Sequence, residues 1–160
     1  MIAVLLAMTP VPASGLDGAY QEPREEIRVQ SDSLSSLAFL VGRWSGQSPD
    51  GSTFYDEYTF GPDGQFRSRR FEDGAFTTST DGSSVEIEDG QIVSKWGPFT
   101  WRAVRLEDGF AEFEPLNAPS SFSWKRIDAD HVEVSQRWTD EAGAAQGYSL
   151  ILTRVAPPHH

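Results

Sequence analysis

Residues 85–96, VEIEDGQIVSKW, hold the pattern that decides the fold of this 160-residue chain. Apolar and polar side chains alternate over Val85–Glu88, and Asp89-Gly90 then separates this segment from Gln91–Trp96. Alternation of this kind places successive side chains on opposite faces of a β-strand. Asp-Gly between two such segments is typical of a type I′ turn, which needs two residues with positive φ. The stretch therefore predicts two adjacent antiparallel strands.

The same Asp-Gly pair recurs at residues 50–51, 63–64, 73–74, 81–82 and 108–109. Around these turns the strand candidates are Arg43–Gln47, Ser52–Phe60, Gln65–Glu72, Ala75–Thr80, Val85–Glu88, Gln91–Trp96, Phe99–Leu106, Phe110–Glu114, Ser121–Ile127, His131–Trp138 and Gly147–Val155. Successive hairpins make neighbouring strands antiparallel, and closure of the sheet removes its exposed edges. We therefore predict an all-β fold, an antiparallel up-and-down barrel of about eight to ten strands.

A short helix is expected to lead into the barrel. Leu34, Leu37, Ala38 and Val41 recur at the spacing of one buried helical face. Gly42 follows, and glycine ends a helix readily because it tolerates a left-handed backbone conformation. The barrel domain is accordingly predicted to span residues 34–155, followed by a short tail over 156–160.

The composition excludes several classes of function. The chain has 13 Lys and Arg against 24 Asp and Glu, so its formal charge of −11 disfavours nucleic acid and anionic membrane surfaces as partners. It contains no cysteine, which excludes disulfide scaffolds, thiolate metal sites and cysteine nucleophiles. The spacing of His, Asp and Glu indicates no metal site, no Gly-x-Ser-x-Gly motif is present, and no cofactor is expected.

The amino-terminal segment is typical of export. An apolar run, Ile2–Met8, leads into the small residues Ala13-Ser14-Gly15, as at the end of a signal peptide. A basic start is missing, since Arg24 is the first cation, so residues 1–15 are predicted to be a truncated or weak signal. A frayed apolar tail or a first strand is the alternative. Residues 16–33 are expected to form a flexible polar leader. The predicted location is periplasmic or secreted, with no membrane insertion of the mature chain.

The entry into the first strand carries a family resemblance. Residues 37–44, LAFLVGRW, resemble the Leu-x-Phe/Trp-Leu-x-Gly-x-Trp entry of an uncharacterised bacterial lipocalin-like family of calycin-type β-barrels. The acidic and aromatic Asp56-Glu57-Tyr58 and the arginines between residues 67 and 70 are similar to its next two strands. In lipocalins an arginine of the last strand packs over the entry tryptophan. The resemblance thus implies that Trp44 and Arg154 close one end of the barrel, an arrangement that cation–π attraction favours.

Strand alternation predicts which side chains share the interior. The candidate ligand-binding residues are Asp56, Tyr58, Arg69, Arg70, Trp101, Trp124, Gln136, Trp138 and Tyr148. Neighbouring strand residues face opposite sides, so only one of the two arginines points inward. A two-residue loop at Asp63-Gly64 would place Arg69 inside opposite Tyr58, whereas a three-residue loop would place Arg70 inside. The inward arginine needs a carboxylate or an anionic ligand, and Asp56 is its natural partner.

Three functions fit this interior. The first is a binding module for a small, largely apolar molecule, with an acidic head that the arginine would meet. The second is an enzyme of the same shape, in which Asp56, an internal arginine and Tyr148 transfer protons. The third is a filled barrel with a structural or partner-binding role. The size of the cavity separates the third from the other two.

Overall fold

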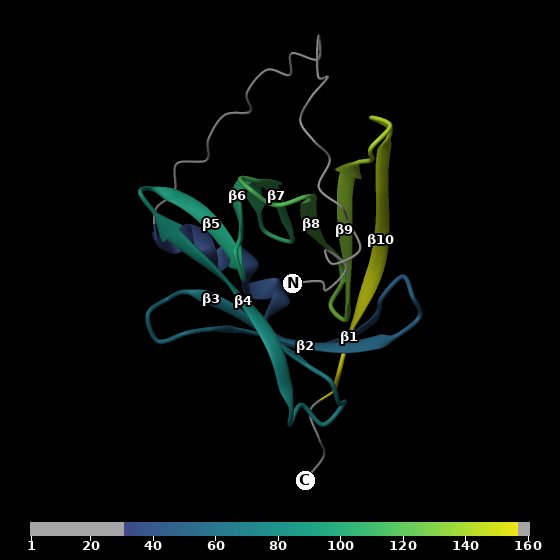
Figure 1. Ribbon diagram of the computed structural model, residues 1–160. Helices are drawn as coiled ribbons and strands as arrows, with labels where there is room; N and C mark the ends of the chain where they lie inside the picture. The colour runs from purple at the N-terminus through teal and green to yellow at the C-terminus, as the bar shows by residue number, and fades with distance from the viewer. Residues whose placement is uncertain (1–30, 157–160) are drawn as a thin grey trace.

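The computed structural model describes residues 31–156, which form a closed antiparallel barrel of ten strands (Figure 1). Each strand pairs with its neighbours along the chain, and β1 pairs with β10 to close the ring. The strands are β1 (Gly42–Gln47), β2 (Thr53–Phe60), β3 (Phe66–Phe71), β4 (Ser79–Glu88), β5 (Gln91–Trp96), β6 (Phe99–Glu107), β7 (Phe110–Pro115), β8 (Ser121–Asp128), β9 (His131–Thr139) and β10 (Ala145–Arg154). The predicted antiparallel up-and-down barrel is confirmed. The signal predicted for residues 1–15, most of the 16–33 leader and most of the tail lie outside the described residues.

The hairpin at residues 85–96 forms as its sequence indicates, but a neighbouring Asp-Gly pair does not turn the chain. Asp89 and Gly90 have φ values of 50° and 77° and join β4 to β5. Asp81-Gly82 instead lies inside β4, so the candidates 75–80 and 85–88 are replaced by one strand that starts at Ser79. A Cβ on Gly82 would come within 2.6 Å of the carbonyl oxygen of Ser68. Glycine at this position therefore allows a close approach between strands rather than a turn.

The entry helix is a 3-10 helix, η2 (Ser31–Leu40), and this changes which residues it buries. Leu34, Leu37 and Leu40 are buried, at intervals of three residues, because side chains at i and i+3 lie in line along a 3-10 helix. Ala38 and Val41 are exposed, so the α-helical face predicted for them is wrong. The helix contacts β6 and β7.

The two ends of the barrel differ. The closed end is the end where η2 lies, β1 begins and β10 finishes; the open end is where β1 finishes and β10 begins. Near the closed end the ladder between β1 and β10 holds two residue pairs, Trp44 with Arg154 and Ser45 with Thr153. Towards the open end the two strands part along a seam. Figure 1 shows the upper part of β10, in yellow, rising away from β1. A groove of about 590 Å³ follows the seam between Gln47 and Ile151.

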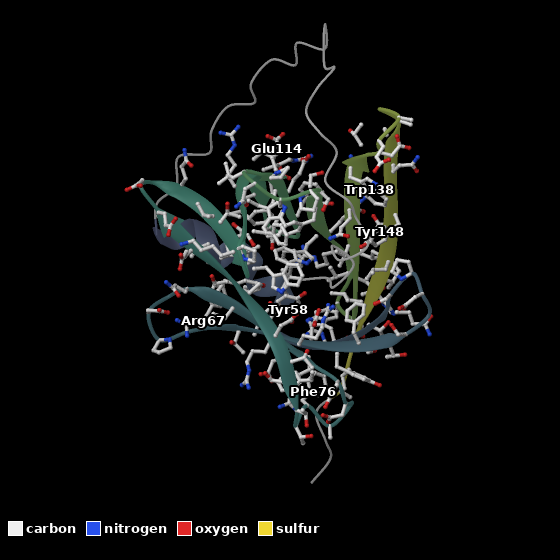
Figure 2. The ribbon with its side chains drawn as sticks, viewed as in Figure 1. Tyr58, Arg67, Phe76, Glu114, Trp138 and Tyr148 are labelled. Atoms are coloured by element: carbon white, nitrogen blue, oxygen red, sulfur yellow. The ribbon has the colours of Figure 1, made fainter. Side chains whose placement is uncertain are left out.

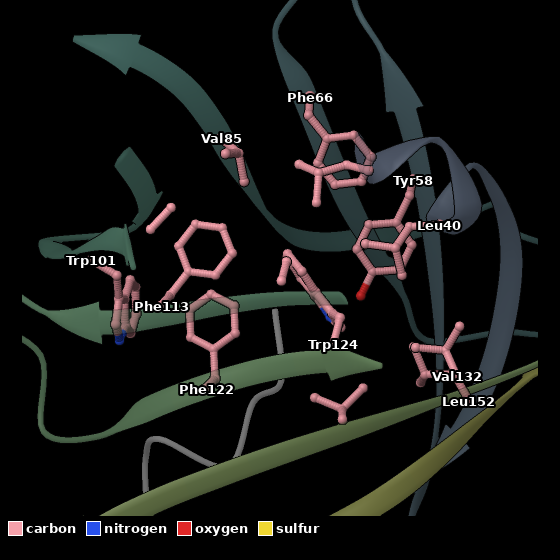
Figure 3. Close-up of a cluster of buried hydrophobic side chains, with 14 of the residues drawn as sticks. Leu40, Tyr58, Phe66, Val85, Trp101, Phe113, Phe122, Trp124, Val132 and Leu152 are labelled. Atoms are coloured by element: carbon pink, nitrogen blue, oxygen red, sulfur yellow. The ribbon is translucent and has the colours of Figure 1, made fainter. Parts of the chain in front are cut away.

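Aromatic side chains pack closely together inside the barrel (Figure 3). Trp124 makes edge-on ring contacts with Tyr58, Phe113 and Phe122, with centroids 5.1–5.9 Å apart. These four side chains are at most 4% exposed. Edge-to-face rings at such separations add to the stabilisation that comes from burial of their surface. These rings therefore form a packed core, and Tyr148 of β10 packs against it.

Candidate functional site

The loop between β2 and β3 decides which arginine faces inward. Gly61 N–H donates to the carbonyl of Gln65 at 2.7 Å, which closes a three-residue loop over residues 62–64. The resulting register sets Asp56 opposite Arg70 and Glu57 opposite Arg69. Arg70 is 7% exposed and lies inside the barrel, whereas Arg69 is exposed on the outer wall. Of the two loop lengths considered from the sequence, the structure has the three-residue one.

Arg70 and Asp56 form a buried ion pair. Arg70 Nε and Nη2 donate to the two carboxylate oxygens of Asp56 at 2.8 and 2.9 Å. The guanidinium also lies 4.1 Å from the centre of the Phe54 ring. Burial opposes the charge of Arg70, but the hydrogen bonds and the charge of Asp56 outweigh it and raise the pKa of Arg70. Two hydrogen bonds therefore fix the guanidinium of Arg70 against Asp56.

Tyr58 and Tyr148 are protonated neighbours of this pair at neutral pH. Tyr58 Oη donates to Asp56 Oδ2 at 3.4 Å, and burial together with the Asp56 charge raises the pKa of Tyr58 well above its ordinary value. Burial also raises the pKa of Tyr148, and the positive charge of Arg70 offsets part of that effect. Arg70 on β3 is thus near enough to Tyr148 on β10 for its charge to act on the tyrosine hydroxyl.

Two buried nitrogen donors in this part of the barrel lack a partner. Among the described residues, Arg70 Nη1 and Gln136 Nε2 make no hydrogen bond. Gln136 is 1% exposed, and its Oε1 accepts the hydroxyl of Tyr148, the residue opposite it on β10. A buried polar atom left without a hydrogen bond costs about 1–3 kcal/mol. Ser94 Oγ and Ser120 Oγ are likewise buried without a hydrogen bond in the described part of the chain, so the barrel holds four such atoms there, two of them these nitrogen donors.

Several half-buried rings lie towards the open ends of their strands. Trp138 contacts Tyr148 edge-on, with ring centroids 5.9 Å apart (Figure 2). Between the end of β5 and the start of β6, Trp96 stacks on Phe99 with ring centroids 6.0 Å apart. Trp96 Nε1 also donates to Asp81 Oδ2 at 3.3 Å. Mixed apolar walls with a few polar groups are typical of small-molecule sites.

The candidate residues fall into two groups, those we assign to the candidate site and those of the aromatic core. Asp56, Arg70, Gln136, Trp138 and Tyr148 belong to the open half, and we call these five residues the candidate site. Trp101, Trp124 and Tyr58 are instead at most 2% exposed within the aromatic core. The indole of Trp101 donates to the carbonyl of Ser120 at 2.7 Å. Arg69 lies outside, because its register places it opposite Glu57 and not Asp56.

Sequence reasoning did not assign Asp81 or Ser94 to the interior. Asp81 belonged to an expected turn, yet it lies opposite Arg70 on β4 and is half-buried. Ser94 is fully buried, and its Oγ makes no hydrogen bond within residues 31–156. Both lie on the same face of the sheet as Val85, because Ser94 pairs with Val85 and Asp81 is four residues before it on β4. Strand parity would have revealed them once β4 was recognised as one continuous strand.

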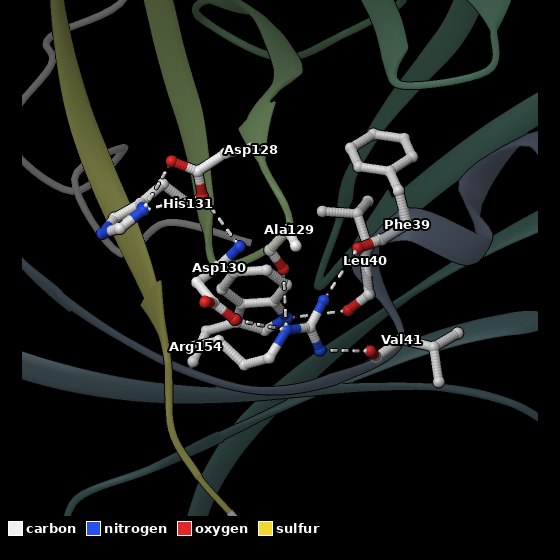
Figure 4. A network of polar contacts seen from close by, with 9 residues as sticks. Phe39, Leu40, Val41, Asp128, Ala129, Asp130, His131 and Arg154 are labelled. Atoms are coloured by element: carbon white, nitrogen blue, oxygen red, sulfur yellow. Dashed lines mark hydrogen bonds and ion pairs between the residues drawn. The ribbon is translucent and has the colours of Figure 1, made fainter.

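At the closed end, Arg154 holds the start of β1 against the end of β10 (Figure 4). Its guanidinium lies 4.2 Å from the centre of the Trp44 ring, and Trp44 is fully buried. Nε, Nη1 and Nη2 donate to the carbonyls of residues 129, 41 and 39 at 3.0, 2.9 and 3.4 Å. The Trp44 indole donates to the carbonyl of Leu40 at 2.8 Å. This cluster ties η2 and both ends of the barrel chain together, and its Trp44 lies opposite Asp56 of the candidate site in the ladder between β1 and β2.

Within residues 31–156 no three His, Asp or Glu side chains gather closely enough to hold a metal ion. His131, at the closed end, pairs with Asp128 at 2.8 Å. None of the helical structure in the described part of the chain has the length and apolar character needed to cross a membrane.

Comparison with known proteins gives likeness in structure alone. No protein-family model and no curated protein matches the chain. Among the solved structures, a protein of unknown function from the DUF3598 family of Nostoc punctiforme matches with a TM-score of 0.52 and 17% identity. The match covers 86% of this chain and 53% of that protein, so the chain spans about half of its length. Rv2717c from M. tuberculosis matches with a TM-score of 0.46 and 13% identity, over 78% of this chain and 98% of that one. The DUF3598 likeness shows the barrel fold.

Proposed function

We propose that this barrel binds one small, largely apolar molecule in its open half, at the candidate site. The observation that carries the proposal is the pair of buried donors, Arg70 Nη1 and Gln136 Nε2, that the protein itself leaves without acceptors. A bound molecule that accepts from them would remove a cost of about 1–3 kcal/mol for each donor. The half-buried rings of Trp138 and Tyr148 would contact its apolar part.

Binding accounts for these groups better than proton transfer does. Asp56 is held by both oxygens in the ion pair, so it serves as the counter-ion of Arg70. Tyr58 and Tyr148 have raised pKa values and keep their protons at neutral pH, which suits hydrogen-bond donors and not bases. The filled-barrel alternative accounts for the aromatic core, where the rings around Trp124 interdigitate. It does not explain buried donors without acceptors in the open half.

The proposal also includes the lipocalin-like family and the periplasmic or secreted location expected from the sequence. A ligand-binding barrel that a short helix enters, with an arginine over the entry tryptophan, is similar to the lipocalin-like family. Together with the apolar run Ile2–Met8, this supports a periplasmic or secreted carrier of a small apolar molecule.

The test is a titration with N-phenyl-1-naphthylamine, a neutral apolar dye that brightens in apolar surroundings. We expect saturable binding at one site. The variants Trp138→Ala and Tyr148→Ala should each weaken it about tenfold, since loss of roughly 50 Å² of contact is worth about 1.3 kcal/mol. The matched control is Phe110→Ala, which removes a ring that lies under Arg105 on the outer wall and should leave binding unchanged. Dye binding that is unsaturable, or equally affected by all three variants, would refute the proposal.

A further inference from the structure

Three charged side chains of the open half lie in one row across three strands. The strand registers set Asp56 on β2 opposite Arg70 on β3, and Arg70 opposite Asp81 on β4. The row thus holds two carboxylates and one guanidinium, so its net charge is negative. Asp81 is half-buried and is fixed by the indole N–H of Trp96 at 3.3 Å.

The charge of Arg70 is already balanced before a ligand arrives. Both Asp56 oxygens contact its Nε and Nη2, and within residues 31–156 its Nη1 has no acceptor. Asp81 also acts electrostatically on Arg70 from the adjacent strand. An incoming anion would lose its water and would meet two carboxylates together with one paired guanidinium. Burial of a charge without a compensating partner is unfavourable.

The two nitrogen atoms without a hydrogen bond, in contrast, are donors, and a neutral oxygen can serve as their acceptor as well as an anionic one. Arg70 Nη1 and Gln136 Nε2 are both N–H groups on side chains that are more than nine-tenths buried. Gln136 is held in place because its Oε1 accepts the hydroxyl of Tyr148. A carbonyl oxygen has two lone pairs and can accept from donors of this kind without adding charge.

We infer that the ligand presents a neutral acceptor oxygen to Arg70 and Gln136, as in an aromatic or aliphatic ketone, ester or amide, and not a carboxylate or phosphate. The inference rests on the proposed function and narrows the sequence-based expectation, which allowed an acidic head. Arg70 then acts as a hydrogen-bond donor with a built-in counter-ion, and Asp81 disfavours anionic competitors.

Three probes of one shape test the inference by equilibrium dialysis at pH 8: 2-acetonaphthone, 2-naphthoate and 2-ethylnaphthalene. The first has a neutral acceptor, the second a carboxylate and the third no polar group. We expect 2-acetonaphthone to bind at least tenfold more tightly than either of the others. Gln136→Leu should weaken 2-acetonaphthone about tenfold and leave 2-ethylnaphthalene unchanged. Asp81→Asn, which keeps an acceptor for Trp96, should strengthen 2-naphthoate about fivefold and leave 2-acetonaphthone unchanged.

The possible results separate the two proposals. Equal or tighter binding of 2-naphthoate, or equal binding of 2-ethylnaphthalene, overturns the neutral-acceptor inference and leaves the proposed binding function standing. An Asp81→Asn variant that affects both oxygen-bearing probes alike also overturns it. Failure of all three probes to bind, while the circular dichroism spectrum is that of a folded barrel, counts against the proposed function and the inference with it.

Discussion

Removal of the Arg70 side-chain charge should destabilise the barrel strongly. In Arg70→Met, the Asp56 carboxylate would stay buried at 1% exposure with only the hydroxyl of Tyr58, 3.4 Å away, as a donor. Loss of one partner from a buried ion pair typically costs about 3–5 kcal/mol, because the remaining charge is uncompensated. We expect a loss of that size in the free energy of unfolding, measured by urea denaturation at pH 7 with tryptophan fluorescence as the signal.

A double variant distinguishes the pair from simple packing. Asp56→Asn combined with Arg70→Met removes both charges and should recover most of the loss, to within about 1–2 kcal/mol of the original protein. Arg69→Met is the matched control, because this neighbouring arginine is exposed, and it should change stability by less than about 0.5 kcal/mol. A cost below about 1 kcal/mol for Arg70→Met, or a double variant no more stable than the single one, would refute the reasoning.

Three further predictions address the core, the tyrosines and the amino terminus. Trp44→Ala should cost about 3–5 kcal/mol in urea denaturation, as a large-to-small change at a fully buried site, and a loss below about 1 kcal/mol would mean that the indole contributes little packing. The pKa of Tyr58 is raised in the folded state. The protonated hydroxyl therefore contributes fully to stability below about pH 10, the pKa of tyrosine in the unfolded chain, and this contribution is lost progressively as the pH rises above that value. Urea denaturation at pH 9 and 11 should therefore show a smaller decline for Tyr58→Phe than for the original protein, and equal declines would contradict the shift. Amino-terminal sequencing of chain exported from its native cell with an intact upstream signal should begin near Leu16, whereas full-length chain found only in the cytosol would contradict export.

The sequence was sufficient for the fold because several local signals agree. Alternation and Asp-Gly turns both require antiparallel hairpins, and nine of the ten strands overlap the segments expected from them one to one. The exception is β4, where Gly82 serves close strand approach, a tertiary role that sequence alone does not distinguish from a turn. The face of η2 was also missed, because a spacing of three residues at Leu34, Leu37 and Leu40 differs little from an α-helical pattern.

The candidate site could be predicted only in part, because strand parity gives the face of a residue and not its depth. Trp101 and Trp138 share the inner face, yet the first is in the packed core and the second is half-buried at the open end. Depth depends on the stagger of all ten strands, which no local pattern specifies. The choice between Arg69 and Arg70 depended on one residue of loop length, a difference that reverses every side chain of β3.

The short ladder between β1 and β10 also bears on how the chain folds. It pairs strands from the two ends of the barrel, and beside it the Arg154 side chain reaches the carbonyl of Val41, 113 positions away in the chain, whereas every other ladder links consecutive strands. Closure of so long a loop carries a high entropic cost, and contacts of high sequence separation slow folding. The meander of hairpins is therefore expected to form first and to curl before its ends meet. A chain truncated ahead of Arg154 would keep the hairpins but remain an open sheet, whose two unpaired edges would be prone to aggregation.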